Sequence, residues 1–101
     1  MKTNTITKAQ VCPAKRLEAG LVVATPGVRE FIPTTELNQA LNRHLRGDWG
    51  EVSAADKTSN DEALESGFRM LSAYTSLNRV KFWIITEGDR SATTLLLPAE
   101  Y

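Results

Sequence analysis

The chain is poor in cysteine and histidine and has no net charge, and each scarcity excludes a class of protein. Cys12 is the only cysteine, so no intramolecular disulfide can form, as is usual in a reducing compartment. Lys plus Arg and Asp plus Glu number 12 each, so no overall basic excess indicates nucleic-acid binding. One histidine and one cysteine provide no metal-ligand spacing, and we therefore expect neither a metal nor a cofactor.

Long apolar runs are also missing. No stretch approaches the roughly 20 apolar residues that a membrane helix needs. The first ten residues, MKTNTITKAQ, lack the apolar centre of a secretion signal. We therefore expect a cytoplasmic protein without a membrane partner. The 101 residues, of which 42% are hydrophobic, suit one small globular domain.

Charge is unevenly distributed along the chain. Residues 1–50 carry seven basic and four acidic residues, whereas residues 51–101 carry five basic and eight acidic ones. The polar, basic start of the chain predicts a mobile N-terminal arm over 1–16, followed by a single domain over 17–101. A basic arm can contact phosphates or an acidic partner, but a solvated tail is the favoured interpretation.

Three β-strands are predicted in the last third of the chain. They are Phe68–Thr75, Val80–Glu87 and Ser91–Leu97, with turn-like residues between them, and they predict a meander. The β-branched run within Leu17–Thr25 predicts a fourth strand, which Pro26 and Gly27 end. The middle strand of the meander is apolar on both faces and so needs a cover on both. The N-terminal strand region or a second subunit could supply the second cover.

Two helices are predicted between the first strand and the meander. Thr34 or Thr35 can cap the first helix, whose apolar residues recur every three or four positions until Gly47 ends it. Ser53 can cap the second helix, from about 54 to 65, which has a weak apolar face. The predicted fold is therefore α+β, with an antiparallel three- to four-stranded sheet, two helices packed on one face, and the order β-α-α-β-β-β.

Several short motifs are similar to one family. They are ATPG at 24–27, HLRGDWG at 44–50, ND-AL at 60–64, LSAY at 71–74 and WIITE-DRSATT-LLP-EY at 83–101. Together they resemble a family of small uncharacterised bacterial proteins often labelled "plasmid-related". The resemblance spans about Leu21 to Tyr101 and implies a bacterial protein of mobile-element background. It implies no activity and transfers no functional residue.

The first candidate site residues lie around the GDWG turn. His44 is the one side chain that titrates near neutrality unperturbed, so it is a weak candidate for a general base. Its place on an apolar helix face favours a packed histidine instead. Asp48 could bind a substrate hydroxyl or a basic partner, and Trp49 could stack on a ligand. The simpler interpretations are a turn-stabilising aspartate and an aromatic residue in the core.

The polar segment that follows the middle strand is the strongest candidate for binding. It brings together carboxylates, a guanidinium and hydroxyls from Glu87, Asp89, Arg90, Ser91 and Thr93. A guanidinium bonds phosphate or carboxylate through two parallel donors, so Arg90 suits an anionic ligand. A simple hairpin turn explains the same residues nearly as well. His44, Glu87 and Arg90 are the weak catalytic candidates if the protein is an enzyme.

These observations favour a non-enzymatic interaction or regulatory module that binds an unknown protein. The apolar middle strand also suggests that the partner is a second copy of the chain, in a homodimer formed through a sheet face. The alternative function is a small nuclease-like enzyme of the toxin type, which would act on RNA or DNA. Binding to nucleic acid without cleavage is not favoured, because no compact helix-turn-helix pattern accompanies the zero net charge.

Overall fold

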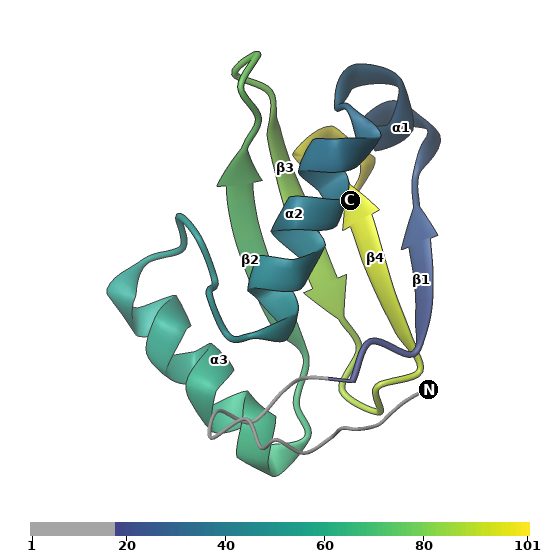
Figure 1. Cartoon of the computed structure of the whole chain (residues 1–101). Coiled ribbons are helices and arrows are strands. Elements are labelled where there is room, and N and C mark those ends of the chain that lie inside the picture. Colours follow the sequence, from purple (N-terminus) through teal and green to yellow (C-terminus); the bar gives the residue numbers. More distant parts are fainter. Residues whose placement is uncertain (1–17) are drawn as a thin grey trace, which may run out of the picture.

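The structure is a computed structural model that describes residues 18–101 (Figure 1). The predicted arm at 1–16 lies outside the described residues. The elements follow in the order β1 (Leu21–Ala24), α1 (Pro26–Phe31), α2 (Thr34–Leu45), α3 (Ala54–Ser66), β2 (Met70–Thr75), β3 (Lys81–Thr86), β4 (Ala92–Leu96) and the 3-10 turn η1 (Pro98–Glu100). Within the described part, no helix has both the length and the apolarity to cross a bilayer.

The four strands form one mixed sheet in the order β1-β4-β3-β2. The pairs β2–β3 and β3–β4 are antiparallel, as predicted for the meander, but β1 runs parallel to β4. The α+β class is confirmed, whereas a fully antiparallel sheet and the order β-α-α-β-β-β are wrong. All three helices lie in the connection between β1 and the meander, and that long connection lets the last strand return beside the first in the same direction.

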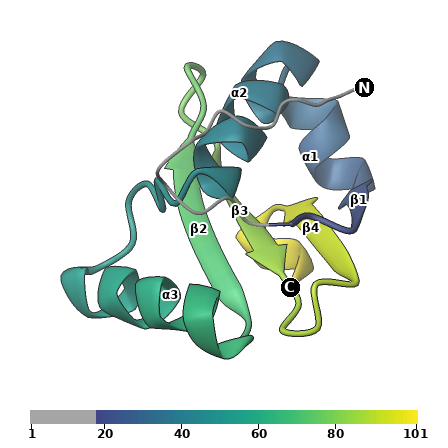
Figure 2. The same ribbon diagram turned by 60° about the horizontal axis from the view of Figure 1, so that its bottom comes forward.

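Helices α1 and α2 cover one face of the sheet (Figure 2). Helix α3 instead flanks the β2 side of the molecule, where it makes its main contacts. The larger core lies under α1 and α2, and Phe82 and Ile84 lie inside it with 2% and 0% of their surface exposed. A smaller cluster under α3 is formed by Trp49, Ala63 and Met70. One of the two apolar faces of the middle strand is therefore covered by the helices.

The helix boundaries agree with the sequence, but one predicted cap is wrong. Thr34 and Thr35 lie inside the first turn of α2, and the residue before the helix is Pro33, which provides no side-chain cap. The Pro33 carbonyl accepts from the amides of Glu36 and Leu37, so the backbone starts the helix without a hydroxyl. In α3 the prediction is confirmed, because the Ser53 hydroxyl accepts from an amide of the first turn.

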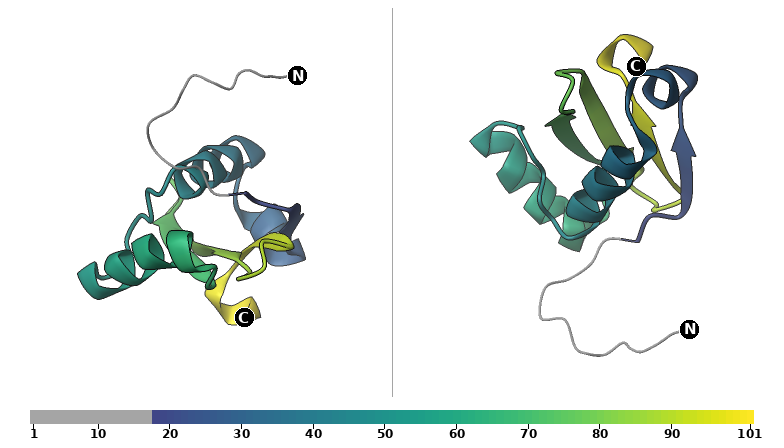
Figure 3. Two further views of the ribbon diagram at one scale, coloured as in Figure 1. Left: turned by 90° about the horizontal axis from the view of Figure 1, so that it is seen from below. Right: turned by 45° about the horizontal axis from the view of Figure 1, so that its top comes forward.

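The second face of the sheet carries Trp83 and Ile85, as the alternation of β3 requires. The C-terminal turn lies on this side, opposite α2 (Figure 3, left). The Tyr101 ring meets the Trp83 ring edge-on, with 5.7 Å between centroids. This cover is therefore the C-terminal turn and not the N-terminal strand, which pairs into the sheet beside β4.

The GDWG turn protects the outer edge of β2. The Ala73 amide donates to the Trp49 carbonyl, and the Glu51 amide donates to the Ala73 carbonyl. Gly50, between them, has a φ of +74°, and a Cβ there would fall on the Ala73 carbonyl oxygen. Only glycine lets this segment approach the strand so closely.

We predict that Gly50→Ala destabilises the protein by about 3 kcal/mol, because it adds a backbone clash to an unfavourable φ. Gly47→Ala is the matched control: its φ is +85°, but the nearest atom to its added Cβ is 3.9 Å away. We expect Gly47→Ala to cost only about 1 kcal/mol. Urea unfolding of both variants measures the difference, and equal losses would contradict the close approach of Gly50.

Candidate functional site

Arg90 lies at the centre of the polar segment that the sequence singles out, and it bonds the backbone. Its Nη1 donates to the carbonyl oxygens of Phe68, Glu87 and Gly88, at 2.9, 3.2 and 3.2 Å. Its Nη2 donates at 2.8 Å to the carbonyl of Ala63, in the last turn of α3. The guanidinium thus ties the end of α3 to the β3–β4 loop, where a positive charge also suits the helix dipole.

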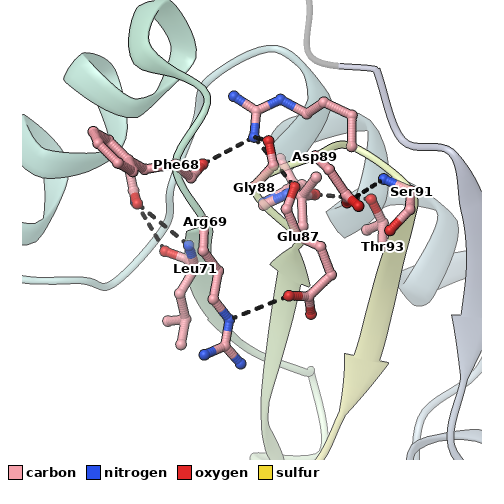
Figure 4. A network of polar contacts seen from close by, with 12 residues as sticks. Phe68, Arg69, Leu71, Glu87, Gly88, Asp89, Ser91 and Thr93 are labelled. Carbon is pink, nitrogen blue, oxygen red and sulfur yellow. Dashed lines mark hydrogen bonds and ion pairs between the residues drawn. The ribbon is translucent and has the colours of Figure 1, made fainter.

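Asp89 and Ser91 of this loop are exposed, whereas Glu87 is half-buried. Figure 4 shows the contacts of all three. The Glu87 carboxylate lies 3.9 Å from Arg69 Nε. The Asp89 carboxylate accepts from the Ser91 amide at 3.0 Å, and hydrogen bonds from Ser91 lower the pKa of Asp89. These contacts are those of a closed turn. A binding role for Glu87, Asp89, Arg90 and Ser91 remains a prediction.

Thr93 and His44 belong to a buried hydrogen-bond network, which we call the His44 network. His44 Nδ1 lies 2.5 Å from Ser72 Oγ, and His44 Nε2 lies 2.8 Å from Thr86 Oγ1. The Thr86 hydroxyl lies 2.8 Å from that of Thr93, which in turn donates to the Ala19 carbonyl at 2.8 Å. All four side chains have 0% of their surface exposed.

The Ala19 carbonyl fixes the direction of the hydrogen bonds that lead from His44 Nε2 through Thr86 to Thr93. A carbonyl only accepts, so the single hydroxyl proton of Thr93 points at Ala19. Thr93 must then accept from Thr86, which has used its own proton and must accept from His44 Nε2–H. His44 Nε2 therefore carries a proton. In the neutral imidazole, Nδ1 then accepts from the Ser72 hydroxyl.

Burial of His44 agrees with this neutral form. Loss of hydration lowers the pKa of His44 from 6.5 to about 4, and Trp49 closes over it edge-on with 5.5 Å between ring centroids. Above pH 6.5 the imidazole is neutral whether the protein is folded or unfolded. Between pH 6.5 and about 4 only the unfolded chain takes up this proton, so this group lowers the free energy of unfolding as the pH falls, by roughly 3 kcal/mol in total.

The three weak catalytic candidates do not converge on one site. His44 bonds Thr86 on the helix side of β3, whereas Glu87, the next residue along, faces Arg69 on the other side. Arg90 is occupied by four carbonyls. The pair of Ser72 and His44 has the geometry of a nucleophile and base, but both side chains are inaccessible to a substrate.

Asp48 and Trp49 have clear structural partners. The Asp48 carboxylate takes two bonds from the Arg43 guanidinium, at 2.7 and 3.2 Å, and this pairing lowers its pKa. Trp49 is 3% exposed, and its Nε1–H donates to Asp61 at 2.9 Å. These contacts explain both residues without a ligand. A ligand-binding role for either residue stays a prediction.

A hollow of about 310 Å³ lies between α3 and β2. Its lining comes from Asp56, Ser59, Asn60, Arg69, Met70, Leu71 and Tyr101. The Arg69 guanidinium lies 5.2 Å from the centre of the Tyr101 ring and faces Glu87. Among residues 18–101, no group of three His, Cys, Asp or Glu side chains is placed to hold a metal ion.

Comparison of the chain with protein-family models, with curated proteins and with solved structures gave no match in any of the three. The resemblance to plasmid-related bacterial proteins therefore stays a prediction.

The most accessible unusual feature is one that sequence reasoning missed. Strand β1 is at the edge of the sheet, and Leu21, Val22 and Val23 are 69%, 45% and 40% exposed. Its apolar run predicts a strand correctly, and such a run normally indicates burial. No sequence signal placed it beside β4 with its other side open. These three exposed residues are apolar and lie outside the polar loop.

For the His44 network we predict that Thr86→Val costs about 2 kcal/mol, because it leaves the buried Nε2–H of His44 without an acceptor. Ser72→Ala, at the end of the network, removes one bond and should cost about 1 kcal/mol. The matched control is Thr94→Val, on the opposite face of β4, with an expected change within about 0.5 kcal/mol. Urea unfolding at pH 7 measures all three, and equal losses for Thr86→Val and Thr94→Val would contradict the network.

Proposed function

We propose that this protein is a non-enzymatic interaction module that binds a protein partner through the outer edge of β1. The observation that carries the proposal is the exposure of three consecutive apolar residues on an edge strand, Leu21 to Val23. An unguarded edge strand offers a row of backbone donors and acceptors to another strand. Many peptide-binding domains use this mode, in which a partner segment adds a strand to the sheet.

The two edges of the sheet differ in whether their outward backbone groups are hydrogen-bonded. At β2, Ala73 bonds the Trp49–Glu51 segment, and Leu71 bonds the Asn60 side chain through both its amide and its carbonyl. At β1, the amides of Leu21 and Thr25 donate inward to the carbonyls of Ser91 and Leu95, so those of Val22 and Ala24 point outward. Among residues 18–101 nothing bonds these outward amides, and β1 carries no charged residue that would discourage pairing.

The nuclease-like alternative has less support. Its candidate base is buried in the His44 network, and its candidate guanidinium is spent on backbone carbonyls. A catalytic group must reach the substrate, so these placements favour binding over catalysis. An accessory role for a protein of mobile-element background fits a module that acts through a partner.

Site-specific photo-crosslinking in a bacterial host tests the proposal. We predict that the full chain with benzoylphenylalanine in place of Leu21 forms a discrete protein adduct on irradiation. The same photoreactive residue in place of Lys57, exposed on α3, is the control and should form none. The second change Val22→Pro should remove the Leu21 adduct, because it deletes an outward amide while leaving the inward bonds of β1 intact.

The proposal fails if residue 21 forms no adduct, or if the adduct survives Val22→Pro. Equal crosslinking yields from positions 21 and 57 would show that the adducts form by random collision and not at a binding surface. An intramolecular adduct to residues 1–17 would also overturn it, because the edge would then be occupied within the same chain.

A further inference from the structure

We infer that the partner at this edge is a second copy of the same chain, paired antiparallel through β1 with Val23 on the two-fold axis. This inference rests on the proposed function, since it names the occupant of the edge proposed there. It follows from which backbone groups of β1 face outward and from what limits the strand at each end.

Symmetry restricts how the edge can meet its own copy. A two-fold axis perpendicular to two identical strands makes them antiparallel. A two-fold axis along the strands would keep them parallel but set like backbone groups against each other, so no hydrogen-bonded ladder would form. In an antiparallel pair, residues whose amides and carbonyls both face the partner exchange two hydrogen bonds. In β1 those residues are Val22 and Ala24, so each must lie opposite an outward-facing residue of the other copy.

Only one register satisfies both residues. With Val22 opposite itself, Ala24 would face Gly20, whose φ of +64° takes it out of the extended conformation. With Ala24 opposite itself, Val22 would face Pro26, which has no amide hydrogen and begins helix α1. With Val22 opposite Ala24 of the second copy, both residues are paired twice over, and four backbone hydrogen bonds form across the axis.

This register also suits the side chains. It sets Val23 of each copy in a pair without hydrogen bonds, where side chains approach most closely. No charged residue occurs between Glu18 and Arg29, so no charge is placed against its own copy near the axis. The product is a continuous eight-stranded sheet in which both β1 edges are covered and both β2 edges keep the protection of the GDWG turn.

Cysteine scanning of the full chain tests the register. In a Cys12→Ser background, Leu21→Cys, Val22→Cys and Val23→Cys are each oxidised with copper phenanthroline, and the disulfide-linked dimer is followed over time. Accessibility ranks these positions 69%, 45% and 40%, so random collision crosslinks residue 21 fastest and residue 23 slowest. The two-fold pair predicts the reverse, with Val23→Cys at least tenfold faster than Leu21→Cys, because only residue 23 faces itself.

Adding Val22→Pro to Val23→Cys removes one donor from each copy and should bring its rate down to that of collision. Circular dichroism confirms that each variant remains folded. Rates of disulfide formation that follow the exposed fractions of residues 21, 22 and 23 would overturn the inference. If the photo-crosslinked adduct is a different protein and Val23→Cys shows no preference, the interaction module stands and self-pairing falls. If the Leu21 adduct is also absent, both fall.

Discussion

The hydrogen bonds of the His44 network join helix α2 to strands β2, β3 and β4 and to the backbone just before β1. From His44 Nε2 to Ala19 each bond depends on the next, because each threonine hydroxyl has one proton and the Ala19 carbonyl accepts the last one. The network therefore fixes how the helix layer sits on the sheet as well as contributing to stability. A buried polar group left without its partner costs more than a bond contributes, so alternative packings are penalised.

This constraint also accounts for the placement of the chemistry. The only histidine and three hydroxyl side chains, the groups best suited to proton transfer, are consumed inside the core. The Arg90 guanidinium is likewise bonded to backbone carbonyls at the end of α3. There it supplies the positive charge that the last turn of the helix lacks. The backbone and the apolar side chains at the outer edge of β1 are accessible, and they are the surface on which the proposed interaction module rests.

Local signals in the sequence predicted the four strands and the helices α2 and α3 but not α1, and the mutual arrangement of the elements was not predictable from them. Apolar spacing located α2, and Ser53 and Gly67 located the ends of α3, because caps act within one turn. The parallel pairing of β1 with β4 depends on contacts about 70 residues apart, which no local pattern encodes. The polar segment at 87–91 was equally ambiguous, because the same residue types build an exposed site or a closed turn. Only the positions of the Ala63 and Phe68 carbonyls distinguish the two for Arg90.

The most direct test of this account is the protonation of His44, read by nitrogen-15 NMR of the imidazole. The chain has a single histidine, so the signal needs no assignment by mutation. The account predicts a neutral ring with its proton on Nε2 at pH 7, which remains neutral until the pH approaches about 4. A ring protonated on Nδ1, or one that titrates near 6.5 in the folded protein, would contradict it.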